Sequence, residues 1–182
     1  MTMKKSFALL IVALLAFSLS VEAQTRYNYH KTGYWGNLEA AAGVTLGGGS
    51  DIGISTVHGG RLGHGVAMGM GLGFYVDVNS VVSTFYIPLF LETKYSPFKS
   101  GRSPYLSLRT GFSINEWVMP GFYLAPALGC DIGRFSFFMR YSLNLYPVSV
   151  DIDIETPGVD IETTGLAHIK THGLSIGFAL NF

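Results

Sequence analysis

Hydrophobic and polar residues alternate strictly over the last eleven positions, residues 172–182. A period of two is typical of a half-buried β-strand. One face of this strand is large and apolar, while the other is small or polar, with glycine, serine, alanine and asparagine. The large residues are Leu174, Ile176, Phe178, Leu180 and Phe182. The contrast between the two faces indicates the class of fold more clearly than it indicates an activity.

Seven earlier segments repeat this alternation, and glycine, proline and small polar residues separate them. The eight predicted strands cover residues 34–46, 51–59, 65–77, 82–95, 105–114, 122–132, 135–145 and 167–182. Pro88 lies inside the fourth segment, where it removes a ladder hydrogen bond and predicts a local bulge. The turns after the second, fourth and sixth strands are predicted at residues 60–64, 96–103 and 133–134.

An even number of alternating strands of about ten residues is the pattern of a transmembrane barrel. Lipid cannot satisfy a free strand edge, so the first strand must pair with the eighth. A soluble, lipocalin-like barrel is the alternative, with large apolar residues inside and a charged exterior. The small second face suits a narrow lumen better than a solvated surface. We therefore predict an all-β fold, an eight-stranded antiparallel up-and-down transmembrane β-barrel.

Composition supports a surface that faces lipid. Only 13% of the residues are charged and 48% are hydrophobic, which leaves too little charge to cover a soluble surface. The formal net charge is zero, so a nucleic-acid partner has no electrostatic support. Cys130 is the single cysteine, which excludes an internal disulfide.

The first residues have the pattern of a secretory signal peptide. Lys4 and Lys5 precede an apolar run over residues 7–17, and the small-residue site Val21-Glu22-Ala23 follows. Eleven apolar residues are too few to cross a bilayer as a helix. We therefore predict a signal peptide over residues 1–23 and a barrel domain over residues 24–182.

Four segments of the chain also carry a family resemblance. Residues 86–90, 103–112, 121–124 and 177–182 read YIPLF, SPYLSLRTGF, GFYL and GFALNF. With them, the chain resembles the small OmpA-like or porin-family outer-membrane barrels of Gram-negative bacteria, of the type common in Bacteroidetes. The resemblance implies an outer-membrane location, both termini in the periplasm, and a monomer surrounded by lipid and lipopolysaccharide. It also implies that the barrel-assembly machinery recognises the terminal strand through Phe178, Leu180 and Phe182.

Charged residues recur on the face predicted to line the lumen. They are Glu39, Glu92, Lys94, Arg109, Asp131 and Arg140. The two glutamates and two arginines lie about four to six residues from the periplasmic end, so at roughly 3.3 Å per residue they share one layer. Because buried charges need partners, these four residues predict an ion-pair cluster. Such a cluster could be a plug that fixes strand register, or a path or gate for ions. The plug is favoured because an eight-stranded lumen is normally filled.

Aromatic residues gather near the predicted strand ends, as in the interfacial girdles of membrane barrels. They include Tyr34, Trp35, Tyr95, Phe98, Phe135 and Phe137.

The connection after the seventh strand, residues 150–165, is unusual. Its two halves look alike, and Pro157-Gly158 between them suits a type II turn. The last two strands are therefore expected to continue beyond the membrane as a hairpin. Its acidic residues are Asp151, Asp153, Glu155, Asp160 and Glu162. A solvated, self-repelling surface is the usual role of such a block. The alternative is a divalent-cation site, for which oxygen ligands suit Ca²⁺ although the spacing matches no calcium loop.

The sequence predicts no enzyme and no cofactor. None of the histidines, His30, His58, His64, His168 and His172, forms the His-x-Ser motif of lipid A deacylase barrels. His172 and Ser175 are three apart, which puts them on opposite faces of a strand. No nucleophile elbow, paired metal-ligand motif or phosphate loop is present.

The preferred function is a structural or surface-interaction barrel with a plugged lumen. The alternatives are a narrow channel for small solutes or ions and, less favoured, a lipid A-modifying enzyme.

Overall fold

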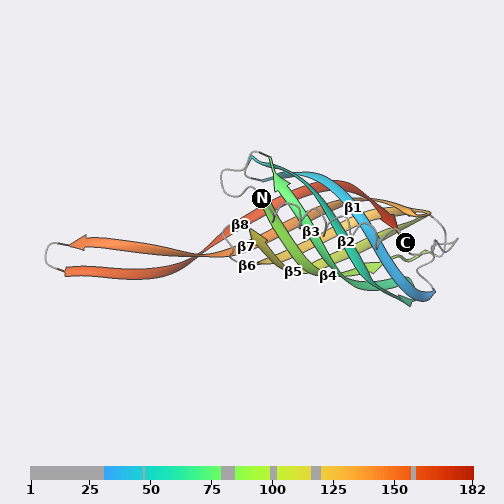
Figure 1. Ribbon diagram of the computed structural model, residues 1–182, viewed down its shortest axis with the longest axis horizontal. Helices are drawn as coiled ribbons and strands as arrows, with labels where there is room; N and C mark the ends of the chain where they lie inside the picture. The colour runs from blue at the N-terminus through green and yellow to red at the C-terminus, as the bar shows by residue number, and fades with distance from the viewer. Residues whose placement is uncertain (1–30, 47, 79–84, 99–101, 116–119, 157–158) are drawn as a thin grey trace, which may run out of the picture.

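The computed structural model describes residues 31–182 except 47, 79–84, 99–101, 116–119 and 157–158, and only the backbone of residues 148–156 and 159–169. Within these residues, eight antiparallel strands form a closed barrel in sequential order, and β1 pairs with β8 (Figure 1). The strands are β1 (Thr32–Thr45), β2 (Ser50–Gly63), β3 (Val66–Asp77), β4 (Phe85–Tyr95), β5 (Arg102–Asn115), β6 (Pro120–Ile132), β7 (Phe135–Thr156) and β8 (Val159–Asn181). The predicted fold class is confirmed. In the described part of the chain, no helix is long and apolar enough to cross a membrane.

Large apolar side chains cover the outside of the barrel, and small or polar ones line the lumen. On β3, Met68, Met70 and Leu72 are exposed, whereas Ala67 before them and Gly71 between the last two are buried. Lumen glycines make room for large residues from neighbouring strands. A Cβ atom on Gly71 would lie 2.4 Å from Cε2 of Phe90. The alternation in the sequence therefore assigned the two faces of the strands correctly.

β2 runs past the predicted turn at residues 60–64. The strand continues to Gly63, and the chain reverses at His64 and Gly65, with positive φ at all three residues. Gly59, before this turn, serves close approach of the backbones rather than chain reversal. A Cβ atom on Gly59 would lie only 2.0 Å from the carbonyl oxygen of Met68 on β3. The predicted turn at residues 60–64 therefore began too early, because residues 60–63 belong to β2.

The predicted bulge at Pro88 was also wrong. The β3–β4 ladder lacks pairs beside Pro88, yet its register is the same on both sides, from Leu72↔Leu89 to Tyr75↔Tyr86. Pro88 points into the lumen and pairs in register with Ser113 of β5. Its missing N–H interrupts the ladder without inserting a residue.

Trp35 does not belong to the aromatic girdle. It is fully buried in the lumen and packs with Val57, Phe90 and Tyr123. Its neighbour Tyr34 is exposed on the outer wall. Alternation along β1 decides this difference, since adjacent residues of a strand face opposite sides. The other girdle residues named from the sequence are exposed.

β7 and β8 extend beyond the other strands. Their register continues from Tyr146↔Ile169 to Thr156↔Val159, and no other described strand pairs with this extension. Figure 1 shows the two orange strands projecting alone from one end of the barrel. The predicted hairpin is confirmed, while the proposed turn at Pro157-Gly158 lies outside the described residues, as does the predicted signal peptide. We call this end of the barrel the hairpin end and the opposite one, where Phe182 lies, the C-terminal end.

Candidate functional site in the charged lumen

The four residues predicted to share a lumen layer lie together. Glu39 (β1), Glu92 (β4), Arg109 (β5) and Arg140 (β7) all point inward and are at most 3% exposed. Nη2 of Arg109 lies 2.6 Å from Oε1 of Glu39 and 2.8 Å from Oε2 of Glu92. Nη2 of Arg140 lies 2.8 Å from Oε2 of Glu39. The two carboxylates and two guanidiniums balance one another in charge.

Strand register and reach across the barrel both position this layer. Glu92 and Arg109 are direct partners in the β4–β5 ladder, and Nε of Arg109 donates to Oε2 of Glu92 at 2.9 Å. Arg109 also crosses the lumen to β1 and β2, where Nη1 donates to the hydroxyl of Ser55 at 3.2 Å. Ser55 in turn donates to Oε2 of Glu39 at 3.2 Å. The layer therefore ties together strands from opposite walls.

Aromatic rings pack against both arginines. The guanidinium carbon of Arg109 lies 4.3 Å from the centroid of the Phe90 ring, and that of Arg140 lies 4.3 Å from the Phe138 ring. Such cation–π contacts stabilise a cation that has lost its water. Arg109 is 0% exposed. Rings and charges therefore pack together at this level of the barrel.

A second ion-paired group lies nearer the C-terminal end. Nζ of Lys94 is 2.8 Å from Oδ1 of Asp131 and 3.7 Å from the centroid of the Tyr105 ring. Ser136 donates to the same oxygen of Asp131, and Asn181 donates to Ser136 at 2.6 Å. The sequence placed Lys94 and Asp131 on the lumen face without pairing them. Their positions could have predicted this pairing. Each is the second-last residue of a strand that ends at the C-terminal end of the barrel, so both lie at the same depth in the lumen.

Histidine and tyrosine pair twice on the outer wall, which the sequence did not indicate. The Tyr34 hydroxyl contacts Nδ1 of His58, and the Tyr141 hydroxyl contacts Nδ1 of His172. Ser175 is buried on the lumen side, where its hydroxyl donates to the carbonyl oxygen of Arg140 at 3.4 Å. His172 and Ser175 therefore lie on opposite sides of the wall and cannot act as a catalytic pair.

The terminal residue closes the seam between β1 and β8. The backbone groups of Phe182 and Gly36 exchange two hydrogen bonds of 2.9 Å. The Phe182 ring centroid lies 6.5 Å from that of Tyr34 and 6.0 Å from that of His58. A Cβ atom on Gly36 would lie 2.6 Å from the Phe182 ring. Of the other two terminal-strand residues, Phe178 is exposed and Leu180 half-buried on the same outer face.

The acidic hairpin is described only by its backbone. The register sets Asp153 opposite Glu162 and Glu155 opposite Asp160. Their side chains, and with them the calcium hypothesis, lie outside the described part of the structure. Among the side chains that are described, no group of three or more histidine, cysteine, aspartate or glutamate residues is placed to hold a metal ion.

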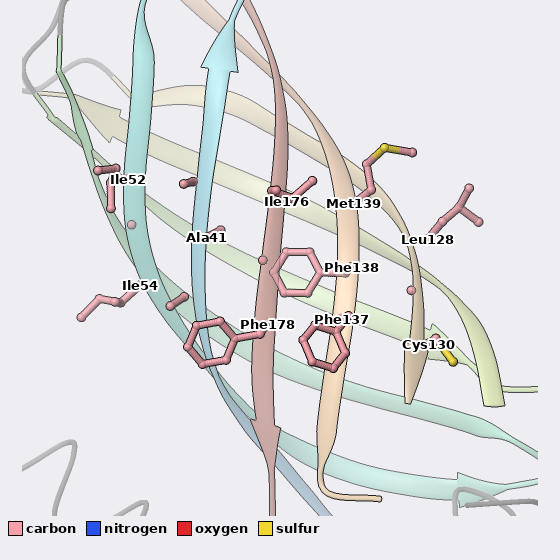
Figure 2. A pocket seen from close by; sticks show the side chains of 15 residues that line it. Ala41, Ile52, Ile54, Leu128, Cys130, Phe137, Phe138, Met139, Ile176 and Phe178 are labelled. Atoms are coloured by element: carbon pink, nitrogen blue, oxygen red, sulfur yellow. The ribbon is translucent and has the colours of Figure 1, made fainter. Parts of the chain in front are cut away.

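An open apolar furrow is lined by residues of β1, β2, β6, β7 and β8. Ile54 of β2, Leu128 of β6, Met139 of β7 and Ile176 of β8 are among its lining residues (Figure 2). Its lining contains no acid, base or histidine. The furrow therefore belongs to the apolar exterior and offers no group for acid–base chemistry.

Comparisons with known proteins support the fold. No protein-family model matches the sequence, and no curated protein matches it. The solved structure of the outer membrane enzyme PagL matches with a TM-score of 0.56 and 10% identity, over 79% of this chain and 98% of PagL. This chain shares the fold of an outer-membrane barrel. Neisserial surface protein A matches with a TM-score of 0.47 and 12% identity, over 84% of this chain and 99% of the other. The N-terminal barrel domain of Pseudomonas aeruginosa OprF matches with a TM-score of 0.44 and 16% identity, over 84% and 100%. At such low identity, the likeness to PagL shows the fold alone.

Proposed function

We propose that this protein is an outer-membrane β-barrel with a structural or surface-interaction role, and that side chains close its lumen. The observation that carries the proposal is the buried layer of Glu39, Glu92, Arg109 and Arg140. Its contacts cross the lumen between strands of opposite walls. Water or a solute could pass this level only if these ion pairs separated.

The outer surface supports the membrane location. Large apolar residues are exposed on all eight strands, among them Ile54, Leu91, Phe112 and Ile176. An apolar surface of this extent is far larger than the patches that soluble monomers expose. In a bilayer the same residues face hydrocarbon, and the closed sheet leaves no unpaired strand edge within it. The shared fold with PagL agrees with this location.

The energetics of buried charge favour a plug over a path. Removing one partner of a buried ion pair leaves an uncompensated charge, at a cost of about 3–5 kcal/mol. A gate would need to break several such contacts together, because Arg109 binds both glutamates and Glu39 binds both arginines. A narrow channel for ions or small solutes remains the second candidate, since the same polar layer would line it.

The family and surroundings are part of the same proposal. We assign the chain to the OmpA-like or porin-family barrels of the Bacteroidetes type, as a monomer in contact with lipid and lipopolysaccharide. The projecting hairpin would then present its acidic residues to the outside, which is the surface-interaction role. Catalysis is not proposed, because His172 and Ser175 face opposite sides of the wall.

Membrane fractionation and a swelling assay test the proposal together. Expressed in a Gram-negative host, the protein is expected in the outer-membrane fraction, with a faster gel mobility before heating than after it. Proteoliposomes that contain the purified barrel should not swell in isosmotic arabinose or glycine. Recovery as a water-soluble protein would contradict the membrane location, and rapid swelling would contradict the closed lumen.

A further inference from the structure

Basic side chains gather at the C-terminal end of the barrel. Lys31 precedes β1, Arg102 begins β5 and Arg134 lies in the turn after β6, and all three are exposed. Arg61 of β2 lies at the same end and is half-buried. Among the described side chains, Lys170 of β8 is the one exposed lysine or arginine at the hairpin end. We call Lys31, Arg102 and Arg134 the basic rim.

Acidic side chains are distributed the opposite way. Among the described side chains, the acid nearest the basic rim is Asp131, which is 4% exposed and paired with Lys94. Asp51 and Asp77 lie at the hairpin end, from which the acidic segment of residues 150–165 projects. The two ends of the barrel therefore differ in charge, and the basic rim favours an anionic partner.

The basic rim lies beside the aromatic girdle of the same end. Tyr34 and Phe135 of this girdle are exposed on the outer wall. Lys31 comes three residues before Tyr34, and Arg134 directly precedes Phe135. At roughly 3.3 Å per residue, these bases are within about 10 Å of the girdle along the chain. Because aromatic girdles mark the boundary between hydrocarbon and headgroups, the basic rim lies at the depth of lipid phosphates.

Strand register brings Arg102 and Arg134 to the same part of the outer wall. Arg102 is the register partner of Ile132 on β6, which in turn pairs with Phe135 on β7. All three residues are exposed. Arg134 follows Ile132 by two residues, and its carbonyl oxygen accepts the backbone N–H of Asn181 at 2.7 Å and Nδ2 of Asn181 at 3.2 Å. Two arginines therefore flank an apolar row, on a turn that β8 holds in place.

We propose that the basic rim binds the headgroups of anionic phospholipids in the leaflet at the C-terminal end. Guanidinium groups bind phosphate oxygens through two parallel hydrogen bonds. The exposed side chains of Ile132 and Phe135 beside them suit the acyl chains of the same lipid. The long stems of arginine and lysine can lie on this apolar wall while their charged ends reach the phosphate. The inference rests on the proposed membrane location and does not depend on whether the lumen is a plug or a path.

Native mass spectrometry in detergent tests the basic rim. The folded full chain is mixed with equal amounts of phosphatidylglycerol and phosphatidylcholine that carry the same acyl chains. One base near an anionic surface favours association by about five-fold, so the wild type should retain phosphatidylglycerol by about ten-fold or more, and high salt should reduce this preference. The triple variant Lys31→Gln, Arg102→Gln and Arg134→Gln should lose it. Lys170→Gln, at the opposite end, is the matched control and should keep it.

Two results of this experiment would overturn the proposal. One is equal retention of the two lipids by the wild type, and the other is a preference that survives in the triple variant. Polyglutamate that binds the rim, without any preference between the lipids, would indicate a soluble acidic partner and would also contradict a lipid site. None of these results bears on the membrane location or the closed lumen, which fractionation and swelling test separately.

Thermal unfolding in vesicles supplies a second readout within a bilayer. Replacing part of the phosphatidylcholine by phosphatidylglycerol should raise the unfolding temperature of the wild type, followed by gel mobility, and leave that of the triple variant unchanged. In detergent without phospholipid the two proteins should unfold at the same temperature, because no headgroup is present. If the triple variant does not fold, Lys31→Gln and Arg102→Gln replace it singly, each with an expected loss of lipid preference of about five-fold. An equal rise in wild type and variant would contradict the basic rim as the binding surface.

Discussion

Arg109 holds the lumen layer together at the scale of single residues. Its guanidinium contacts Glu39, Glu92 and Ser55 and packs on Phe90, so strands from opposite walls meet at this one side chain. The sequence placed Arg109 in the right layer, because alternation fixed its face and distance along the strand fixed its depth. It could not show which carboxylate each arginine binds, since that depends on the tilt of strands across the barrel.

Replacing Arg109 by Met should destabilise the barrel by about 3–5 kcal/mol, because two glutamates lose their buried partner. Urea unfolding in detergent or lipid, followed by tryptophan fluorescence, measures the change. Arg134→Met in the exposed turn after β6 is the control, with an expected change within about 0.5 kcal/mol. Adding Glu39→Gln and Glu92→Gln to the Arg109 variant should recover part of the loss. Equal stability of the Arg109 and Arg134 variants would contradict a structural role for the layer.

Deleting Phe182 should reduce outer-membrane insertion while export across the inner membrane continues. The deletion removes two backbone hydrogen bonds to Gly36 and the ring contacts with Tyr34 and His58. The fraction of protein recovered in outer membrane and in periplasm gives the result. Phe135→Ala, which removes an exposed aromatic residue at the same end of the barrel, should insert normally. Normal insertion of the truncated chain would contradict the assembly role of the terminal strand.

Sequence patterns were most informative about the strands. They predicted which segments form strands better than where each strand ends. A period of two identified all eight elements, since each must bury one face and expose the other. Strand ends were less predictable where glycine or proline intervened. The glycines here suggested a strand end at Gly59 and a turn from Gly60, yet β2 continues to Gly63, and at Gly59 the backbones of β2 and β3 approach closely. Glycine in a strand and glycine in a turn look alike in sequence.

The two glycines make a matched pair for testing this correction. Gly59→Ala places a methyl group 2.0 Å from the Met68 carbonyl oxygen, whereas the nearest atom to a Cβ on Gly60 is 3.7 Å away. Overpacking at Gly59 should cost about 1–3 kcal/mol. Gly60→Ala should change the unfolding free energy little. Equal tolerance of both substitutions in urea unfolding would favour the turn predicted from the sequence.

The hairpin extension should be dispensable for the barrel. β7 and β8 pair with β6 and β1 only up to Leu145 and Gly173, so the described backbone of residues 150–165 pairs with no other described strand. Replacing them by Asn-Gly, which forms a tight hairpin turn, should preserve outer-membrane insertion and the unfolding free energy. Circular dichroism melting and gel mobility measure the outcome. Failure of this variant to fold would show that the extension helps form the barrel.

Closure of the sheet is the property that unites the whole molecule. It was predictable from composition and alternation together. An apolar outer surface indicates lipid, and lipid cannot satisfy the backbone groups of an unpaired strand edge. The filling of the lumen was less predictable. Trp35 looked like a girdle residue from its place at a strand end, although alternation along β1 puts it inside. The Lys94–Asp131 pair joins β4 and β6 across β5, a proximity that no local pattern contains.

Single-channel recording in planar bilayers tests the closed lumen most directly. The wild-type barrel should insert without steady conductance in 1 M KCl, because ion pairs and rings fill the level of Arg109. A triple variant with alanine at Glu39, Arg109 and Arg140 should show discrete openings if it folds, since it removes the side chains that cross the lumen. Large, steady openings of the wild-type protein would contradict the plug and favour a channel.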